Sequence, residues 1–117
     1  MSIEGKVAII TGASSGIGYA TALALSKAGV KVAIGARRTD KLKQLENEIK
    51  KNGGDVLSQK LDVTKKTDCD AIVEQTIKKW GTVDILVNNA GLMPLSFVKS
   101  LKAVSYTHLT LPTIYSV

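Results

Sequence analysis

The chain has 117 residues, of which 44% are hydrophobic and 22% are charged, a composition that suits one globular domain with a modest core. No apolar run approaches the roughly 18 residues of a membrane helix, and the first residues lack the long apolar stretch of a signal peptide. The single cysteine, Cys69, has no second cysteine with which to form an internal disulfide. These features predict a soluble, cytoplasmic protein without a membrane partner.

The net charge of +6 is compatible with nucleic-acid binding, but the basic residues do not gather into a dedicated patch interleaved with aromatic residues. Most lysines lie at the ends and outer faces of predicted helices, where they suit solvent and the helix dipole. They are Lys41, Lys43, Lys50, Lys51, Lys65, Lys66, Lys78 and Lys79. We therefore expect no nucleic-acid partner.

The first half of the chain alternates between short apolar runs and helical patterns. Val7–Ile10 is fully apolar, as a strand covered on both faces should be, and a helix is predicted over Ile17–Ala28, ending at Gly29. A second buried strand is predicted over Val32–Ala36. Thr39 is a candidate cap for the next helix. That helix carries Asp40 in its first turn, an inner stripe of Leu42, Leu45 and Ile49, and an end at Lys50, Lys51, Asn52 and Gly53.

The alternation continues in the second half. The segment 56–63 is a more polar strand that suits the edge of a sheet. The clearest helix follows, with Asp68 and Asp70 in its first turn and a stop at Gly81. Its buried face is predicted to consist of Cys69, Ile72, Val73, Thr76, Ile77 and Trp80. A fourth strand is predicted over Asp84–Ala90.

This order of elements predicts an α/β fold with a parallel sheet and helices on both faces. About four strands are counted, in the order 3-2-1-4, which corresponds to the N-terminal half of a Rossmann-like doubly wound fold. In that arrangement strand four would be an unpaired, apolar edge.

A glycine-rich turn, TGASSGIG, lies between the first strand and the first helix, at positions 11–18. Gly12 lets the chain leave the strand sharply, Gly16 lets the backbone approach a pyrophosphate, and Gly18 lets the helix pack tightly on the sheet. The N-terminus of the helix offers unpaired N–H groups to phosphates, and Ser14 and Ser15 add hydroxyl donors. In this position the turn predicts a dinucleotide site.

The G-x-x-x-G-x-G spacing, with its leading threonine, resembles the short-chain dehydrogenase/reductase family. Asp62-Val63 resembles the pair that this family uses against adenine, and Asn88-Asn89-Ala90-Gly91 matches its NNAG motif. The likeness runs from about Gly5 to about Lys102. It implies a phosphate cradle of Gly12, Ser14, Ser15, Gly16, Ile17 and Gly18, an adenine site at Asp62 and Val63, and an adenosine side completed by Asn89, Ala90 and Gly91. From the residues alone, Asn88 could equally tie one loop to another, and Asp62 could cap the helix that follows.

The end of the second strand indicates the cofactor. An acidic residue there would favour NAD, whereas this chain has Ala36 followed by Arg37 and Arg38. Guanidinium groups can bind a 2′-phosphate through paired hydrogen bonds, so NADP(H) is predicted and NAD is less favoured. No metal site is predicted.

The catalytic residues that the family resemblance implies are absent from this sequence. The family uses a serine and a Tyr-x-x-x-Lys pair, in which the lysine lowers the pKa of the tyrosine. Tyr19, Tyr106 and Tyr115 lack that lysine, and no lysine follows Lys102. We therefore expect a fragment of an oxidoreductase that moves hydride between NADP(H) and an alcohol/carbonyl substrate, without catalytic residues of its own. Its parent would be a homo-oligomer, as family members often are. The alternative is a non-catalytic NADP(H)-binding module or redox sensor.

The end of the chain differs in composition. All 16 basic and all 10 acidic residues lie at positions 1–102, and 103–117 contain none. The segment VSYTHL, at 104–109, resembles a translated transposon adapter used for sequencing libraries. We therefore predict an NADP-binding half-domain over 1–102 and a non-native tail over 103–117. The alternative is a natural C-terminus that forms an edge strand, against which Pro112 argues mildly.

Overall fold

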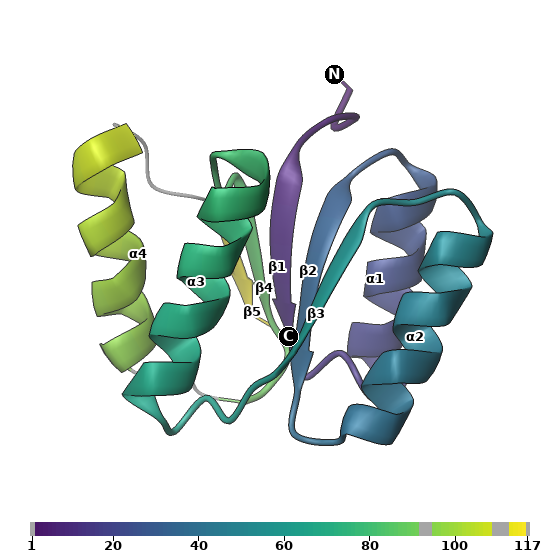
Figure 1. Ribbon diagram of the computed structural model, residues 1–117, viewed down its shortest axis with the longest axis horizontal. Helices are drawn as coiled ribbons and strands as arrows, with labels where there is room; N and C mark the ends of the chain where they lie inside the picture. The colour runs from purple at the N-terminus through teal and green to yellow at the C-terminus, as the bar shows by residue number, and fades with distance from the viewer. Residues whose placement is uncertain (1, 92–94, 109–112, 117) are drawn as a thin grey trace.

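The computed structural model describes residues 2–91, 95–108 and 113–116, in which strands and helices alternate (Figure 1). In chain order the elements are β1 (Val7–Thr11), α1 (Gly16–Lys27), β2 (Lys31–Ala36), α2 (Thr39–Lys51), β3 (Val56–Lys60), α3 (Lys66–Trp80), β4 (Ile85–Asn88), α4 (Leu95–His108) and β5 (Thr113–Ser116). None of the helices among the described residues is long and apolar enough to cross a membrane.

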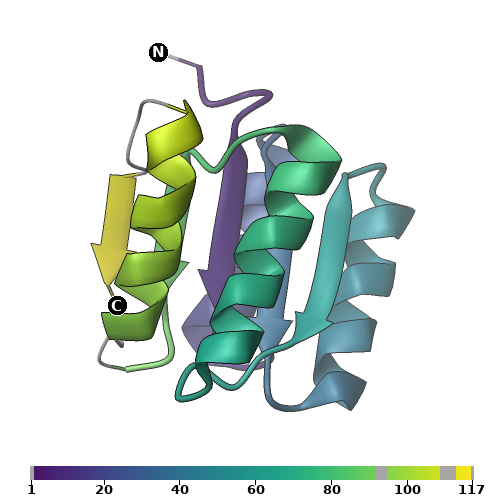
Figure 2. The same cartoon turned by 60° about the vertical axis from the view of Figure 1, so that its left-hand side comes forward.

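The described strands form one parallel sheet in the order β3-β2-β1-β4-β5. The α1–α2 pair covers one face of this sheet and the α3–α4 pair covers the other (Figures 1 and 2). The predicted parallel α/β fold is confirmed. The predicted strand order 3-2-1-4 matches the first four strands of the observed order, to which β5 is added. Since all strands run the same way, their carboxyl ends gather the loops at one edge.

The prediction that β4 would be an unpaired edge is wrong. β5 pairs with it in parallel, from Ile85 opposite Thr113 to Asn88 opposite Ser116, and the Thr113 N–H donates to the Asp84 carbonyl over 2.9 Å. Threonine, isoleucine and tyrosine favour strands, and ladder hydrogen bonds need only backbone groups, so an uncharged segment can complete the sheet. Pro112 lies outside the described residues.

Two apolar cores lie on the two faces of the sheet. β1 is buried along its whole length, and its residues divide between the faces because strand side chains alternate. The α3 face predicted from its periodicity is confirmed, with Cys69, Ile72, Val73 and Thr76 buried and Ile77 and Trp80 packed against them. In α4, Phe97 and Leu101 complete this second core.

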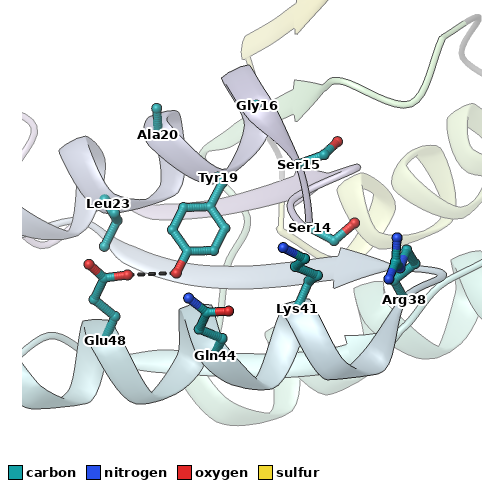
Figure 3. A pocket seen from close by; sticks show the side chains of 10 residues that line it. All are labelled: Ser14, Ser15, Gly16, Tyr19, Ala20, Leu23, Arg38, Lys41, Gln44 and Glu48. Atoms are coloured by element: carbon teal, nitrogen blue, oxygen red, sulfur yellow. Dashed lines mark hydrogen bonds between the residues drawn. The ribbon is translucent and has the colours of Figure 1, made fainter.

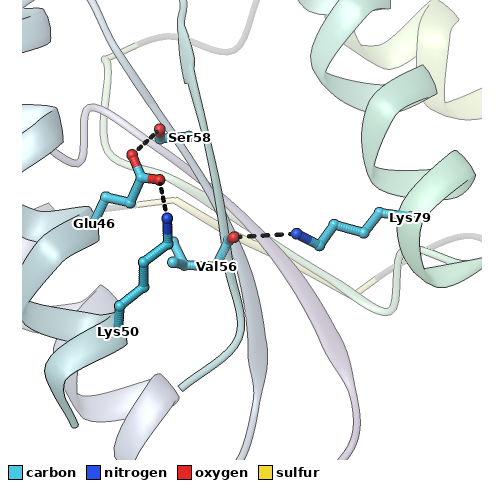
Figure 4. Close-up of polar contacts among 5 residues, drawn as sticks. All are labelled: Glu46, Lys50, Val56, Ser58 and Lys79. Atoms are coloured by element: carbon cyan, nitrogen blue, oxygen red, sulfur yellow. Dashed lines mark hydrogen bonds and ion pairs between the residues drawn. The ribbon is translucent and has the colours of Figure 1, made fainter. Parts of the chain in front are cut away.

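β3 is an edge strand, as its polar sequence predicted, and contacts from both helical layers hold it (Figure 4). On one side Glu46 of α2 accepts a hydrogen bond from the Ser58 hydroxyl over 2.6 Å and pairs with Lys50 over 2.8 Å. On the other side Lys79 of α3 donates to the Val56 carbonyl over 3.5 Å. The polar Ser58 of this strand therefore has a partner within the fold.

Two details of the helix starts differ from the predictions. Thr39 is the first residue of α2 and not its cap, because Arg38 occupies that position without a side-chain capping bond. In α3, Asp68 lies in the first turn, but Asp70 lies beyond it and pairs with Lys66 over 2.7 Å. Both differences amount to one or two residues, which is the usual uncertainty of helix boundaries.

Candidate functional site

The three glycines of the β1–α1 turn have three different surroundings. Gly12 has φ +63°, and a Cβ on it would lie 2.7 Å from the Asn89 carbonyl oxygen. A Cβ on Gly18 would collide with the Gly12 carbonyl oxygen, so α1 begins directly against the turn. Gly16 has φ +46° and open space around its Cβ position. The first and last glycines therefore permit close packing, whereas Gly16 leaves the backbone open to a ligand.

A hydrogen-bond network joins this turn to the loop after β4. The Thr11 hydroxyl donates to the Asn88 side-chain oxygen over 3.0 Å and accepts from the Asn89 N–H over 3.1 Å. The Asn89 amide donates to the Gly12 carbonyl over 3.1 Å, and the Asn88 amide donates to the Gly91 carbonyl over 2.6 Å. Asn88 is 2% exposed and ties its loop to β1, so the loop-tying interpretation of this residue is the one that the geometry favours.

A pocket of about 390 Å³ opens at the carboxyl edge of the sheet. Seven of the predicted site residues line it, and they come from four separate loops: Gly12, Ser14, Arg37, Arg38, Asp62, Val63 and Ala90. Leu61 and Thr64 also line it, and the sequence analysis missed both, although they flank the predicted Asp62-Val63 pair. The remaining predicted residues lie outside this lining; they are Ser15, Gly16, Ile17, Gly18, Asn89 and Gly91.

Asp62 has an ionised side chain fixed within its loop. Its carboxylate accepts from the Thr64 hydroxyl over 2.6 Å and from the Thr64 N–H over 3.0 Å, and these bonds, ahead of the charges of Arg37 and Lys65, lower its pKa. The helix-capping interpretation is not supported, because α3 begins at Lys66 with Lys65 in the cap position.

The two arginines after β2 are both exposed. The Arg38 guanidinium lies 3.5 Å from the Asp40 carboxylate, with side-chain exposures of 68% and 69%, so this ion pair is long and solvent-screened. Among the described residues, Arg38 has only this long ion pair, and the Arg37 side chain forms no hydrogen bond or ion pair. Both therefore remain available to an anionic ligand.

A second groove, of about 820 Å³, lies between α1 and α2 and shares Ser14 and Arg38 with the first pocket (Figure 3). At its far end the Tyr19 hydroxyl donates to the Glu48 carboxylate over 2.6 Å, and this hydrogen bond, followed by desolvation, raises the pKa of Tyr19 to about 12. The phenol therefore stays protonated at neutral pH and is unsuited to act as a base. Among the described residues, no group of three His, Cys, Asp or Glu side chains could hold a metal ion.

Comparison with known sequences shows to which family a chain with this fold and this glycine turn belongs. The family described as short chain dehydrogenase matches residues 6–110. The chain therefore belongs to the short-chain dehydrogenase family, and it has the parallel α/β fold described above.

Individual relatives and solved structures show how far the similarity extends. An uncharacterized oxidoreductase of Listeria monocytogenes is 49% identical over 102 residues, which cover 87% of this chain and 41% of the relative. An alcohol dehydrogenase from the archaeon Thermococcus sibiricus, solved with 5-hydroxy-NADP, is 42% identical, with a TM-score of 0.69 over 74% of this chain and 37% of that one. An NAD+-bound xylitol dehydrogenase, 24% identical, shares the fold, with a TM-score of 0.87 over 99% and 54%. The chain thus spans less than half the length of the curated relatives it matches.

Proposed function

We propose that this chain is the cofactor-binding part of an NADP(H)-dependent oxidoreductase that interconverts an alcohol and a carbonyl compound. The observation that carries the proposal is the charge at the end of β2. Arg37 and Arg38 line the pocket there, and the position where an NAD-binding site would hold a carboxylate is Ala36. A 2′-phosphate is favoured by guanidinium groups and repelled by a carboxylate, so these residues select NADP(H).

The surroundings of the glycine turn suit a pyrophosphate. Helix α1 has no acidic residue in its first turn, and its cap residue, Ser15, makes no side-chain capping bond. The first N–H groups of a helix lack partners within the helix and carry its positive dipole end, so they can donate to phosphate oxygens. Gly16 leaves open space beside them. When bound, the nicotinamide supplies or accepts the hydride.

The adenosine side would be held by the residues of the smaller pocket. Asp62, Val63 and Ala90 would flank the adenine and its ribose, while Asn89 and Gly91 keep the loop after β4 in place. The roles of Ser15, Ile17 and Gly18 in the phosphate cradle follow from their place in the turn. Ile17 is 60% exposed at the start of α1, where it is free to contact a ligand.

We propose further that the 117-residue chain binds the cofactor without turnover. It contains no Tyr-x-x-x-Lys pair, and the Tyr19 hydroxyl donates to Glu48, a hydrogen bond that raises the pKa of Tyr19. The parent enzyme would supply these residues, work in the cytoplasm and assemble as a homo-oligomer. The alternative proposal is a non-catalytic NADP(H)-binding module or redox sensor, which would bind NADPH yet show no turnover even as the full-length gene product.

The domain assignment is part of the same proposal. Residues 1–102 would form the NADP-binding unit, and residues 103–117 would come from outside the gene. Sequencing the source genome through codon 102 tests this directly. A frame that continues into a serine and a Tyr-x-x-x-Lys pair would support both the assignment and the enzyme, whereas a genome that encodes SYTHLTLPTIYSV and then a stop would contradict both.

The cofactor proposal is tested by fluorescence titration of the chain with NADPH and with NADH. We expect NADPH to bind at least about tenfold more tightly, because charge-assisted hydrogen bonds to the 2′-phosphate have no counterpart in NADH. The preference should shrink as salt is raised, since the arginines are exposed. Equal binding of the two nucleotides, or tighter binding of NADH, would contradict the NADP(H) assignment.

A further inference from the structure

The groove between α1 and α2 has a positively charged end beside the glycine turn. Ser14, Arg38 and Lys41 line this end, and Figure 3 shows the Lys41 side chain rising from α2 toward the α1 side of the groove, close to Ser14 and Arg38. Ser14 and Arg38 also line the smaller pocket that we assign to the adenosine. The two hollows therefore meet at these two residues.

The backbone fixes this arrangement. The Ala13 N–H donates to the Gly35 carbonyl over 3.1 Å, which holds the segment before Ser14 against the end of β2. Arg38 is the cap residue of α2, and Lys41 follows it by three positions, so both side chains leave the same face of the helix. At the other end of the groove, the 2.6 Å bond between Tyr19 and Glu48 ties α1 to α2.

The charges at this end are not balanced within the protein. Lys41 forms no ion pair among the described residues, and Arg38 has only the long, exposed contact with Asp40. The carboxylate that lines the groove, that of Glu48, lies at the far end and accepts a hydrogen bond from Tyr19. A lysine in the first turn of a helix also opposes the helix dipole, so an anion bound there would relieve an unfavourable interaction.

We propose that Lys41 is a further specificity-determining residue for NADP(H), which adds a cation from α2 to the arginines after β2 and, beside Ser14 and Arg38, would bind the 2′-phosphate. This inference rests on the proposed function and deepens it. The glycine turn itself carries no basic residue, and Lys41 brings a second cation to it from α2. A 2′-phosphate on a ribose held in the smaller pocket would meet the residues that the two hollows share.

A rival location exists on the other side of the arginines. A hollow there is lined by Arg37, Arg38, Lys60 and Lys65, but also by Asp62 and Asp68. The lowered pKa of Asp62 keeps that carboxylate charged at neutral pH, and a charged carboxylate repels phosphate. The end of the α1–α2 groove beside Ser14 is therefore the better anion site.

The test uses calorimetric titration of the whole 117-residue chain with 2′,5′-ADP and with 5′-AMP, which differ only in the 2′-phosphate and need only the adenosine side. We compare Lys41→Gln with Lys43→Gln, a matched loss of charge at an exposed position of α2 outside the three hollows, and with Lys60→Gln for the rival location. Lys41→Gln should weaken 2′,5′-ADP binding about fivefold and leave 5′-AMP unchanged, since one exposed charged contact is lost. Lys41→Arg should restore most of the affinity.

The possible results distinguish a failure of the inference about Lys41 from a failure of the NADP(H) assignment. Two results would overturn the inference about Lys41 while the unsubstituted 117-residue chain still prefers 2′,5′-ADP: Lys41→Gln behaves like Lys43→Gln, or Lys60→Gln causes the larger loss of affinity. Either result leaves the NADP(H) assignment standing. If the unsubstituted 117-residue chain binds 2′,5′-ADP no better than 5′-AMP, the NADP(H) assignment fails and the inference fails with it. Thermal melting followed by circular dichroism establishes that each variant is folded.

Discussion

Gly18→Ala tests how closely α1 packs against the turn that precedes it. The added Cβ would collide with the Gly12 carbonyl oxygen, and it would lie 2.5 Å from the Asn89 side-chain nitrogen and 3.0 Å from the Gly12 carbonyl carbon. Two of these three atoms belong to the backbone of the glycine turn, which the Asn89 amide also holds through its bond to the Gly12 carbonyl. Relief of the clash therefore requires movement of the turn itself.

The expected loss of stability can be worked out from two opposing terms. Overpacking against backbone costs about 3 kcal/mol, whereas alanine in place of glycine within a helix gains about 1 kcal/mol. The net destabilisation is about 2 kcal/mol, which corresponds to a lowering of the melting temperature by about 8 °C for a chain of this size. Urea denaturation followed by circular dichroism measures the free energy directly, and NADPH titration should show weakened binding because the phosphate cradle moves.

Gly16→Ala is the matched control in the same turn. Nothing lies within 4 Å of its Cβ position, so the cost is limited to the left-handed backbone, with φ +46°. That strain is worth about 1 kcal/mol for alanine. If Gly18→Ala were as stable as the unsubstituted chain, or lost less free energy of unfolding than Gly16→Ala, the close contact between α1 and the turn would be refuted.

Three further substitutions probe the polar contacts. Asn88→Ala removes the buried hydrogen bond to Thr11 and the partly buried one to the Gly91 carbonyl. It should cost about 2–3 kcal/mol in urea denaturation because both partners lose their bonds, and a loss below about 0.5 kcal/mol would contradict the network. Glu46 has a lowered pKa, first through Lys50 and then through Ser58, so its stabilisation is complete above its ordinary pKa of 4.5 and is lost as the pH falls through the lower folded value. Glu46→Gln should therefore flatten the loss of stability on acidification below that pH, and an unchanged acid profile would count against this contact. Tyr19 has its pKa raised to about 12 by Glu48, so its bond stabilises the fold below the ordinary value of 10.0 and is lost as the pH rises through 12. A spectroscopic pH titration of tyrosinate should show this late ionisation, and Tyr19→Phe should abolish it.

Local chemistry made much of the fold predictable. The strands at Val7–Ile10 and Val32–Ala36 were identified because strands buried on both faces require unbroken apolar runs. The ends of α1, α2 and α3 are predictable because each is followed by a glycine, at Gly29, Gly53 and Gly81, and all three have positive φ in the structure. These signals involve only neighbouring residues, so they can be recognised without knowledge of the tertiary fold.

Helix α4 is not among the predicted elements, and β5 corresponds to the alternative in which the end of the chain forms an edge strand. The stripe of Phe97, Ser100 and Leu101, all buried, is the signal that could have revealed α4. β5 is only four residues long, and its place depends on the free edge of β4. A short strand is defined by the partner it pairs with, and the sequence of the strand does not name that partner.

The sequence by itself determined the class of the protein: the order of strands and helices, the glycine turn, and the residue types that a dinucleotide needs. Only the tertiary structure decided which of those residues meet. It joined Thr11 to Asn88 and Asn89 across more than 70 positions, and it brought Lys41 to Ser14 across a groove between two helices. The reason is physical. Backbone preferences and apolar periodicity act locally, whereas the contacts between loops depend on how the helices and strands pack against one another.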